Sequence, residues 1–529
     1  MRFACDTLLN VPVQQFAVAD VERHPQTGVR LLLVAVVAVA ALLVDGTASG
    51  IITAGLSYQQ GRTAATPDES SWFVTAFNAP YYATILLSPW LYARFGRKTL
   101  LLGGLLGFGI CSVILALIDS YHLTVVLRFL QGMFLGCVFV PAALLLLTSL
   151  PLAITPRVIP AFTCLVLVAG IIGTLIGGYL SESFGAAALY VPGAIFTLIA
   201  AALVWRYSHG YDAPQPRLRF DIIGYTLSLL MFGAMQYLAN EGERRNWLDS
   251  ESVVWAIVLL AFALPAFIIW EVLIASRPHA NLRLFAAYRN LLVAGAINMV
   301  LGAVGYAVTL FSTYLQNVAS ATITLAGAII ALRAVTYLVG IAFGFFILSR
   351  RLLDIRLILV STAVASAIAL YGFAYAMTPT AEAATFVGVS LGFGLVFALL
   401  SQPVPSLVIG GLPIQDLPAG IAIYKITVPL GLMAGTAFIS SLVDHRAAFH
   451  ASQIAASFNE SRPPITTFAS TGPLSLLQLN QLVVQQAQAV AYRDAMVALC
   501  FMLLLVVPLA LFVIPPKPQP PPSPPSSEK

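Results

Sequence analysis

Long apolar runs dominate the chain, and short polar segments separate them. A run of about 20 apolar residues is long enough to cross the hydrocarbon core of a bilayer as a helix. The pattern therefore predicts an all-α polytopic membrane protein. Counting such runs gives about 14 transmembrane helices, at residues 31–56, 72–92, 99–118, 123–149, 158–180, 187–206, 221–239, 253–273, 291–315, 324–348, 355–377, 384–411, 418–442 and 495–514.

Composition agrees with this pattern. Of the 529 residues, 59% are hydrophobic and 9% are charged, whereas a soluble domain carries roughly 25% charged residues. The net charge of +5 is small for a nucleic-acid-binding protein, so we expect the lipid bilayer and no nucleic acid as a partner. Residues 1–29 are polar and of mixed charge, which is not the pattern of a cleavable signal peptide.

Basic residues in the polar segments predict the orientation. Cytoplasmic loops carry an excess of Lys and Arg, and four predicted loops on one side are basic. Because the predicted helix count is even, both termini are expected in the cytoplasm and the protein in the cell (inner) membrane. The basic clusters are Arg94, Arg97 and Lys98; Arg206, Arg217 and Arg219; Arg277, Arg283 and Arg289; and Arg350, Arg351 and Arg356.

The same pattern divides the chain into expected domains. Residues 474–492 have helical spacing with an apolar face, and we expect this stretch of the outer loop to pack on the outer mouth. The predicted divisions are a cytoplasmic tail at 1–29, a six-helix bundle at 30–208, two extra transmembrane helices with a linker at 209–283, a six-helix bundle at 284–514 that includes an outer loop at 443–494, and a proline-rich cytoplasmic tail at 515–529.

Asp45 is the only charged residue in the first predicted helix. A carboxylate at bilayer depth costs at least a few kcal/mol, so it pairs with a cation, takes up a proton or faces water. We interpret Asp45 as the proton-handling acid of a secondary transporter. The alternative is a buried acid that only bonds a neighbouring helix.

Arg128 is the expected partner of Asp45 because the two lie at similar depth. Arg128 lies roughly 9 Å inside the outer end of its predicted helix. Asp45 lies roughly 21 Å above the inner end of its own, in a core of about 30 Å. A nearby guanidinium favours the ionised carboxylate and a dry cavity favours the protonated one, a competition that suits proton loading and release. Gln131, one turn along, adds a neutral donor and acceptor.

The segment SPWLYARFGRKTLLL at 88–102 resembles the loop between helices 2 and 3 of the major facilitator superfamily, G-x-L-A-D-R-x-G-R-K. Pro89 and Ala93 replace the family's glycine and aspartate, and the resemblance implies a conformational latch that lacks this aspartate. The alternative is that the basic residues only set topology. The matching residues are Leu91, Arg94, Gly96, Arg97 and Lys98.

Two further motifs agree with this family. Arg128 and Gln131 match its R-x-x-Q-G pattern in helix 4. In helix 5 the glycines match the antiporter signature G-x-x-x-G-P-x-x-G-G, with Thr174 in place of the proline, and small residues allow close helix approach. We expect this glycine-rich helix to form the contact between the two bundles. The matching glycines are Gly173, Gly177 and Gly178.

Longer stretches resemble one branch of the superfamily, the fourteen-span drug:proton antiporters. The resemblance covers nearly the whole chain and implies the export of a drug-like or lipophilic compound in exchange for protons, by alternating access. In Gram-negative cells this branch often works with a periplasmic adaptor and an outer-membrane channel, which are therefore candidate partners. The residues that carry it are Asp45, Thr47, Asp221, Gly224, Glu241, Gly242, Trp247, Asp249, Gln486, Ala487, Ala491, Tyr492 and Asp494.

Several polar residues at membrane depth are candidates for substrate binding. Arg333 and Lys425 could bind an anionic or carboxylated substrate, or else pair with backbone carbonyls or extend to the interface. Aromatic and amide side chains could line the pocket, although aromatic residues more often serve packing or the interface. This second set comprises Asn78, Tyr81, Gln131, Tyr314 and Gln316.

An enzyme is not expected. The string GRKT at 96–99 lacks the upstream glycine of a nucleotide-binding loop. The five cysteines and six histidines are scattered, so we expect neither a metal site nor a cofactor. Two alternatives to the exporter stay open: a proton-coupled importer or facilitator of a small organic solute, and a membrane sensor that transports nothing.

Overall fold

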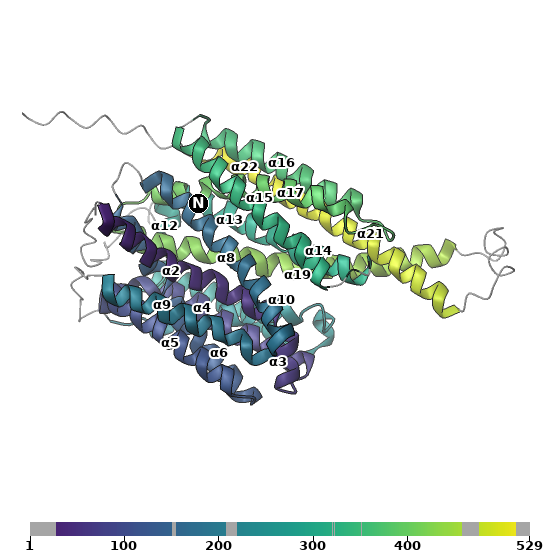
Figure 1. The fold of residues 1–529 in the computed structure, drawn as a ribbon, viewed down its shortest axis with the longest axis horizontal. Coiled ribbons are helices and arrows are strands. Elements are labelled where there is room, and N and C mark those ends of the chain that lie inside the picture. Colours follow the sequence, from purple (N-terminus) through teal and green to yellow (C-terminus); the bar gives the residue numbers. More distant parts are fainter. Residues whose placement is uncertain are drawn as a thin grey trace, which may run out of the picture.

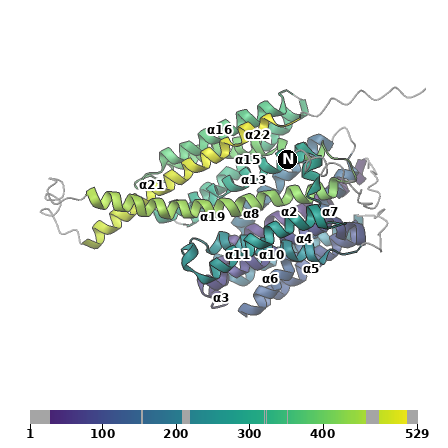
Figure 2. The same ribbon diagram turned by 180° about the vertical axis from the view of Figure 1, so that it is seen from behind.

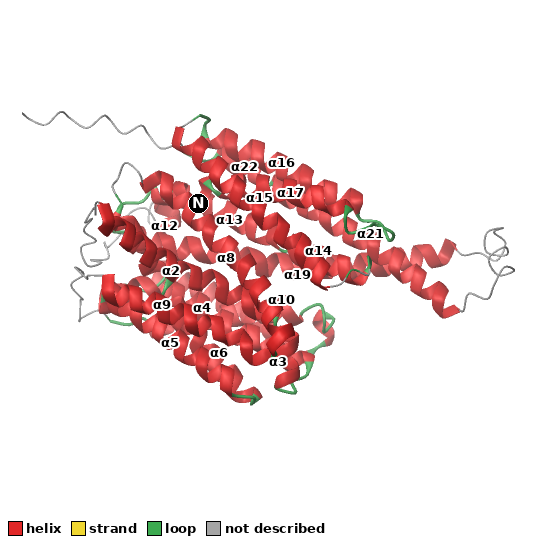
Figure 3. Ribbon diagram, in the orientation of Figure 1, coloured by secondary structure: helices red, strands yellow, loops and turns green. Residues whose placement is uncertain are grey.

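The computed structural model describes residues 28–150, 155–207, 219–319, 321, 323–350, 352–457 and 476–514. In these ranges every regular element is a helix and none is a strand (Figure 3). This confirms the predicted all-α class. Most of the predicted N-terminal tail and all of the predicted C-terminal tail lie outside the described residues.

The first half of the chain forms one group of packed helices (Figure 1). Within it α2 packs on α7, α8 and α9, while α4 and α5 both pack on α6. These elements are α2 (Gly28–Ala54), α3 (Leu56–Arg62), α4 (Pro67–Phe95), α5 (Arg97–Leu117), α6 (Tyr121–Gly136), α7 (Phe139–Ser149), α8 (Thr155–Phe184), η1 (Ala186–Tyr190) and α9 (Val191–Tyr207).

A helix pair follows, formed by α10 and α11, and α10 packs against both α4 of the first group and α19 of the second. The elements of this region are α10 (Ile222–Glu241), η2 (Trp247–Asp249), α11 (Glu251–Ile269), the π-helical turn η3 (Trp270–Ile274) and α12 (Arg283–Ala287).

The second half forms another group, in which α13 packs on α19, α15 on α17, and α21 on α16 and α19. The two groups meet where α8 contacts α15 and α18, and where α4 and α7 contact α19. The elements are α13 (Arg289–Gly305), α14 (Ala307–Asn317), α15 (Ile323–Arg350), α16 (Ile355–Ala376), α17 (Thr385–Ser401), α18 (Pro403–Ile409), α19 (Leu417–Ser457), α21 (Leu476–Leu504) and α22 (Val506–Leu511).

Twelve helices in the described part of the chain are long and apolar enough to cross a membrane. Helices α4 and α8 occupy the two remaining predicted spans, 72–92 and 158–180. Helix α4 has a more polar composition and contains Pro80 and Pro89, which weakens its hydropathy. The count of fourteen crossings, and the domain boundaries drawn from it, stay predictions.

Short breaks divide four of the predicted spans into two helices each. The predicted span 123–149 breaks at Cys137 and Val138, whose amides bond carbonyls three residues back instead of four. Pro141 follows within the first turn of α7, where its missing N–H costs no helical hydrogen bond. The breaks in two more predicted spans likewise precede Pro403 and Pro508. The fourth break, at Tyr306 between α13 and α14, has no proline near it.

The described parts of the predicted outer loop at 443–494, residues 443–457 and 476–494, are helical. Helix α19 continues to Ser457 and α21 begins at Leu476, so both extend well past the predicted spans. Figures 1 and 2 show this pair of helices projecting beyond the other elements instead of packing on the outer mouth. Arg446 and His450 of α19 bond Asp494 of α21, at 2.7 and 2.9 Å, and hold the two helices together.

Candidate functional site

Asp45 is the centre of a buried polar contact between the two helix groups. It lies in α2 and is 2% exposed. The Lys425 ammonium, from α19, donates a hydrogen bond of 2.7 Å to Oδ2 of Asp45. The Tyr81 hydroxyl, from α4, donates to Oδ1. The carboxylate therefore has a cation from one group and a hydroxyl from the other.

Lys425 is less buried than Asp45, and its side chain is 21% exposed. Its Nζ atom lies 4.1 Å from the centre of the Phe139 ring, at the start of α7. An ammonium over an aromatic face gains electrostatic stabilisation that grows as water is excluded. Lys425 is thus held by one acid and one ring, both from the first helix group.

An apolar pocket adjoins this contact. It begins at Phe139 and follows α7 toward Leu147, the end predicted to be cytoplasmic. Both helix groups contribute walls, so its shape depends on their relative position. The lining residues are Leu42, Phe139, Ala143, Leu146, Leu147, Val166, Pro405, Val408, Ile409, Ile421 and Tyr424. An amphipathic molecule placed there would have its apolar part in the pocket and its polar end near Lys425.

The expected pair of Asp45 and Arg128 is not formed, and this prediction was wrong. Arg128 is 1% exposed and donates to the Phe73 carbonyl at 3.2 Å and to Oε1 of Gln131 at 2.7 Å. Gln131 in turn donates to the Ser112 hydroxyl at 2.8 Å. Arg128 and Gln131 therefore join α4, α5 and α6 inside the first helix group.

Helix α4 separates Arg128 from Asp45. The Arg128 guanidinium lies 4.4 Å from the centre of the Phe77 ring, and that ring stacks on Tyr81 with centroids 5.7 Å apart. Phe77 and Tyr81 are one turn apart on the same face of α4. Aromatic residues of α4 therefore stand between Arg128 and Asp45.

The other predicted pocket residues lie elsewhere. Asn78 donates to Gln236 of α10 at 3.1 Å and so faces the extra helix pair. Tyr314 is fully buried in the second group and donates to the Thr378 carbonyl at 2.6 Å. Gln316 bonds the Ser312 hydroxyl of its own helix at 3.0 Å. None of these three lines the pocket next to Asp45.

Arg333 occupies a separate pocket inside the second helix group. Its guanidinium lies 5.8 Å from the centre of the Phe393 ring. Phe311 and Phe373 line the same pocket. Arg333 is therefore surrounded by residues of its own group and does not reach the contact between the groups. A role for it in substrate binding stays a prediction.

The basic turn at 94–98 has the tight geometry expected of it. Gly96 has a φ of +78° where α4 ends and α5 begins, a conformation that favours glycine. Arg97 is buried and donates to the Thr148 hydroxyl of α7 at 3.0 Å. Lys98 donates to the Trp205 carbonyl of α9 at 2.9 Å. Nη1 of Arg94 is buried without a hydrogen bond to the described residues.

Two glycines of α8, Gly173 and Gly177, pack against α2 within the first helix group. A Cβ at Gly173 would meet the Thr47 carbonyl oxygen at 2.5 Å, and one at Gly177 would meet that of Ile51 at 2.4 Å. Both contacts are with the backbone of α2. Gly178 has open space on its side-chain face. Helix α8 as a whole does form part of the contact between the two bundles, through α15 and α18, as expected. Its glycines Gly173 and Gly177 serve a different contact, because these small residues let α2 and α8 approach closely.

The pairing of Lys425 with Asp45 could not be predicted from the sequence. Lys425 was a substrate-binding candidate, yet 380 residues separate it from Asp45 and no periodicity joins them. Phe139, whose ring lies under the ammonium, was not singled out. In the sequence, only the opposite charges of Asp45 and Lys425 point to a pair. Arg128 carries the same charge as Lys425, so charge alone could not distinguish the two possible partners of Asp45.

The chain is similar in sequence to known membrane transporters. The sequence model of the Major Facilitator Superfamily matches residues 34–436. The chain is 24% identical to the multidrug export protein EmrB of Escherichia coli over 471 residues, 88% of this chain and 90% of that protein. It is 27% identical to the fatty acid resistance protein FarB of Neisseria gonorrhoeae over 250 residues, 47% of this chain and 49% of that protein.

Solved structures agree on the fold. The chain is similar to the POT family transporter PepTSo, with a TM-score of 0.56 and 12% identity over 92% of this chain and 99% of that one. It is also similar to the human organic anion transporter MFSD10, with a TM-score of 0.54 and 13% identity over 89% of this chain and 99% of that one. At these identities the likeness concerns the fold alone.

Proposed function

Since the chain belongs to the major facilitator superfamily, we propose that it exports a small lipophilic organic compound in exchange for protons. The observation that carries this proposal is the ion pair between Asp45 of α2 and Lys425 of α19, which joins the two helix groups beside an apolar pocket. Transporters of this type rock one bundle against the other around a site near the midplane. An ion pair across that contact links ionisation to the relative position of the bundles.

The proposed cycle follows from the charge on Asp45. When Asp45 is ionised, it holds Lys425 and the two helix groups stay joined at this point. A proton on Asp45 removes the attraction, because the neutral acid no longer attracts the ammonium. Lys425 is then left with the Phe139 ring and with whatever occupies the pocket. Loading one proton from outside therefore releases the contact that the ionised acid maintains.

The pocket supports a lipophilic substrate. Its lining is apolar apart from the Tyr424 hydroxyl, and Lys425 lies at one end. Burial of apolar surface supplies most of the affinity in such pockets, and a few polar groups orient the ligand. The names of the relatives, which refer to multidrug export and fatty acid resistance, agree with substrates of this kind.

We further propose an inner-membrane location with both termini in the cytoplasm, and a periplasmic adaptor that leads to an outer-membrane channel. The basic loops support the orientation. The helical extension formed by α19 and α21 supports a docking partner, because it carries exposed apolar residues such as Phe449, Leu482 and Val484.

The direction of transport is tested in inverted membrane vesicles. With an acidic vesicle interior, an exporter takes up lipophilic cations or anions from the medium and releases protons. The same vesicles treated with an ionophore that abolishes the pH gradient, and vesicles without the protein, serve as controls. We expect uptake that requires both the protein and the gradient.

The alternatives give different results in the same assay. A proton-coupled importer accumulates the compound in whole cells and not in acid-loaded inverted vesicles. A membrane sensor gives no flux in either preparation. Either result for a broad panel of lipophilic compounds would contradict the exporter proposal.

A further inference from the structure

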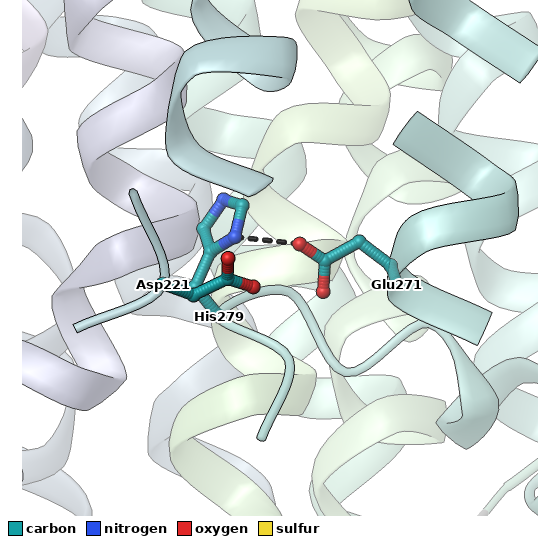
Figure 4. Close-up of side chains that lie close together, drawn as sticks. All are labelled: Asp221, Glu271 and His279. Atoms are coloured by element: carbon teal, nitrogen blue, oxygen red, sulfur yellow. Dashed lines mark ion pairs between the residues drawn. The ribbon is translucent and has the colours of Figure 1, made fainter. Parts of the chain in front are cut away.

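A second group of ionisable side chains lies where the extra helix pair joins the second half of the chain. Asp221 precedes α10, Glu271 belongs to the π-helical turn η3, and His279 lies in the segment before α12. One ligand atom from each of the three lies within 4.8 Å of the others. Figure 4 shows the three side chains converging.

Two of these side chains are deeply buried. Glu271 is 0% exposed and His279 is 5% exposed. Nδ1 of His279 and Oε1 of Glu271 face each other at 2.6 Å, yet neither atom has a hydrogen bond of acceptable geometry to a described residue. Buried polar atoms without hydrogen bonds are rare and require an explanation such as an ion.

The backbone leaves room on the side where the three groups converge. A Cβ built on Gly224 would lie 2.5 Å from Oε1 of Glu271, 2.7 Å from Oδ2 of Asp221 and 2.8 Å from Nδ1 of His279. A side chain at this position would therefore collide with all three ligand atoms. The glycine keeps one face of α10 clear for them.

The charges around this cluster are unbalanced. Two carboxylates meet here, and among the described residues only His279 forms an ion pair with either of them. The nearby Arg283 donates instead to the carbonyls of Val272 and Ala275. Burying the Glu271 carboxylate without a cation is costly. A divalent cation bound to neutral histidine would balance the charge of Glu271 and of the half-buried Asp221.

We propose that Asp221, Glu271 and His279 bind a divalent transition-metal ion of the zinc type. One imidazole nitrogen and two carboxylate oxygens are ligands that Zn²⁺ accepts, and such an ion has bonds of about 2.0–2.2 Å. Water or Asn281 would fill the remaining coordination positions of the ion. The side-chain oxygen of Asn281 is also buried without a hydrogen bond to a described residue.

The surrounding hydrogen bonds are those that orient metal ligands. The Trp270 indole donates to both Asp221 oxygens at 3.0 Å, and the Ala280 amide donates to Oε2 of Glu271 at 3.1 Å. This leaves Oε1 of Glu271 for the metal. Hydrogen-bonded carboxylates of this kind fix ligand orientation in known metal sites.

The ion would have a structural role. It would join the start of α10, the end of α11 and the segment leading to α12, which meet in space but are separated by a long stretch of chain. The extra helix pair would then be fastened to the chain that enters the second helix group. This role lies outside the transport cycle proposed above and does not depend on it.

The test is zinc binding by the purified full-length protein, without a histidine tag, in detergent. Equilibrium dialysis against Zn²⁺ with metal analysis should show one equivalent bound, and the thermal midpoint should rise by several degrees because the ion binds the folded state. His279→Gln should weaken binding at least tenfold and remove this rise. His450→Gln, which changes a histidine of the α19–α21 extension, should bind Zn²⁺ like the wild type.

Gly224→Ala is an informative second variant, because it keeps all three ligands and places a methyl group among them. It should lose Zn²⁺ as well. Wild-type protein that binds no stoichiometric Zn²⁺, or His279→Gln protein that binds it as tightly as the wild type, would overturn the proposal.

X-ray absorption on the zinc-loaded wild type gives a result that does not depend on any variant folding. The proposal predicts a first shell of nitrogen and oxygen at about 2.0–2.1 Å with one imidazole. A shell that contains sulfur, or several imidazoles, would place the ion elsewhere and contradict the assignment.

Discussion

At the scale of single residues, the account depends on the bond between Asp45 and Lys425. Both groups are charged when they pair, and Asp45 is shielded from water. Removing one partner leaves the other charge without its counterion, which is more costly than removing both. This asymmetry separates an energetically coupled pair from two residues that are merely close.

A double-mutant cycle measures this coupling. We expect Asp45→Asn and Lys425→Gln each to lower the free energy of unfolding by about 1–3 kcal/mol, and the double variant to lose less than the sum. Reversible unfolding in a denaturing detergent gives the three values. Additive losses would show that the pair contributes no coupling.

Arg128 is expected to behave as a structural residue. Arg128→Ala leaves the Phe73 carbonyl and the Gln131 side chain without their donor in a buried region. We therefore expect the free energy of unfolding to fall by about 2–4 kcal/mol, which is measured as a lower thermal midpoint. The protein that does fold should still couple transport to the pH gradient. Wild-type stability with lost coupling would support instead the sequence-based pairing with Asp45.

The sequence predicts that Asp45 is a functional residue, but it does not predict which residue pairs with it. Asp45 stood out because a lone acid in an apolar run must find a partner. The partner of Asp45 was not predictable. Two residues at the same depth in the membrane can face different sides of their helices, so equal depth does not bring them into contact. Three-dimensional packing placed Phe77 between Arg128 and Asp45, and it brought Lys425 close from the far end of the chain.

At the scale of elements, the apolar periodicity located the helices well. Each predicted span has a helix at its place, and the differences lie in short breaks, three of them near prolines, and in the length of α19 and α21. Those two helices run past their apolar segments because the predicted outer loop has helical sequence of its own. Hydropathy therefore indicates where a membrane helix is and not where the helix ends.

The packing of α2 on α8 supplies a test at this scale. Gly177→Ala places a methyl group against the α2 backbone, whereas Gly178→Ala places one in open space. We expect Gly177→Ala to cost about 1–3 kcal/mol of stability and Gly178→Ala to be neutral or slightly stabilising in the helix. Thermal unfolding of the two variants in one detergent compares them directly. Equal effects would contradict the assigned helix contact.

The cluster of Asp221, Glu271 and His279 shows another limit of sequence reasoning. No metal site was expected because the histidines are scattered along the chain. The three residues proposed as ligands come from three elements that meet only after α10 and α11 pack as a pair. Spacing motifs detect ligands that share one helix or loop, and these do not.

At the scale of the whole molecule, an ionisable contact joins the two helix groups. The ion pair between Asp45 and Lys425 is the salt bridge between the groups among the described residues. A contact of this kind can be opened by one proton, while the apolar surfaces around it can slide. The fold therefore concentrates the ionisable link between the bundles at one point.

The account predicts how that link controls transport. Counterflow exchanges labelled for unlabelled substrate and needs no net proton movement, whereas uphill transport needs the proton to be released in each cycle. Asp45→Asn should retain counterflow and lose uphill transport. Asp119→Asn, which changes an exposed acid bonded to Arg62, should retain both.

The most direct measurement therefore compares the two transport modes in the same proteoliposomes, for wild type, Asp45→Asn and Asp119→Asn. The account predicts that Asp45→Asn exchanges substrate by counterflow and accumulates none when a pH gradient is imposed. Uphill transport by Asp45→Asn that equals the wild type at every pH would contradict the central claim that Asp45 carries the coupled proton.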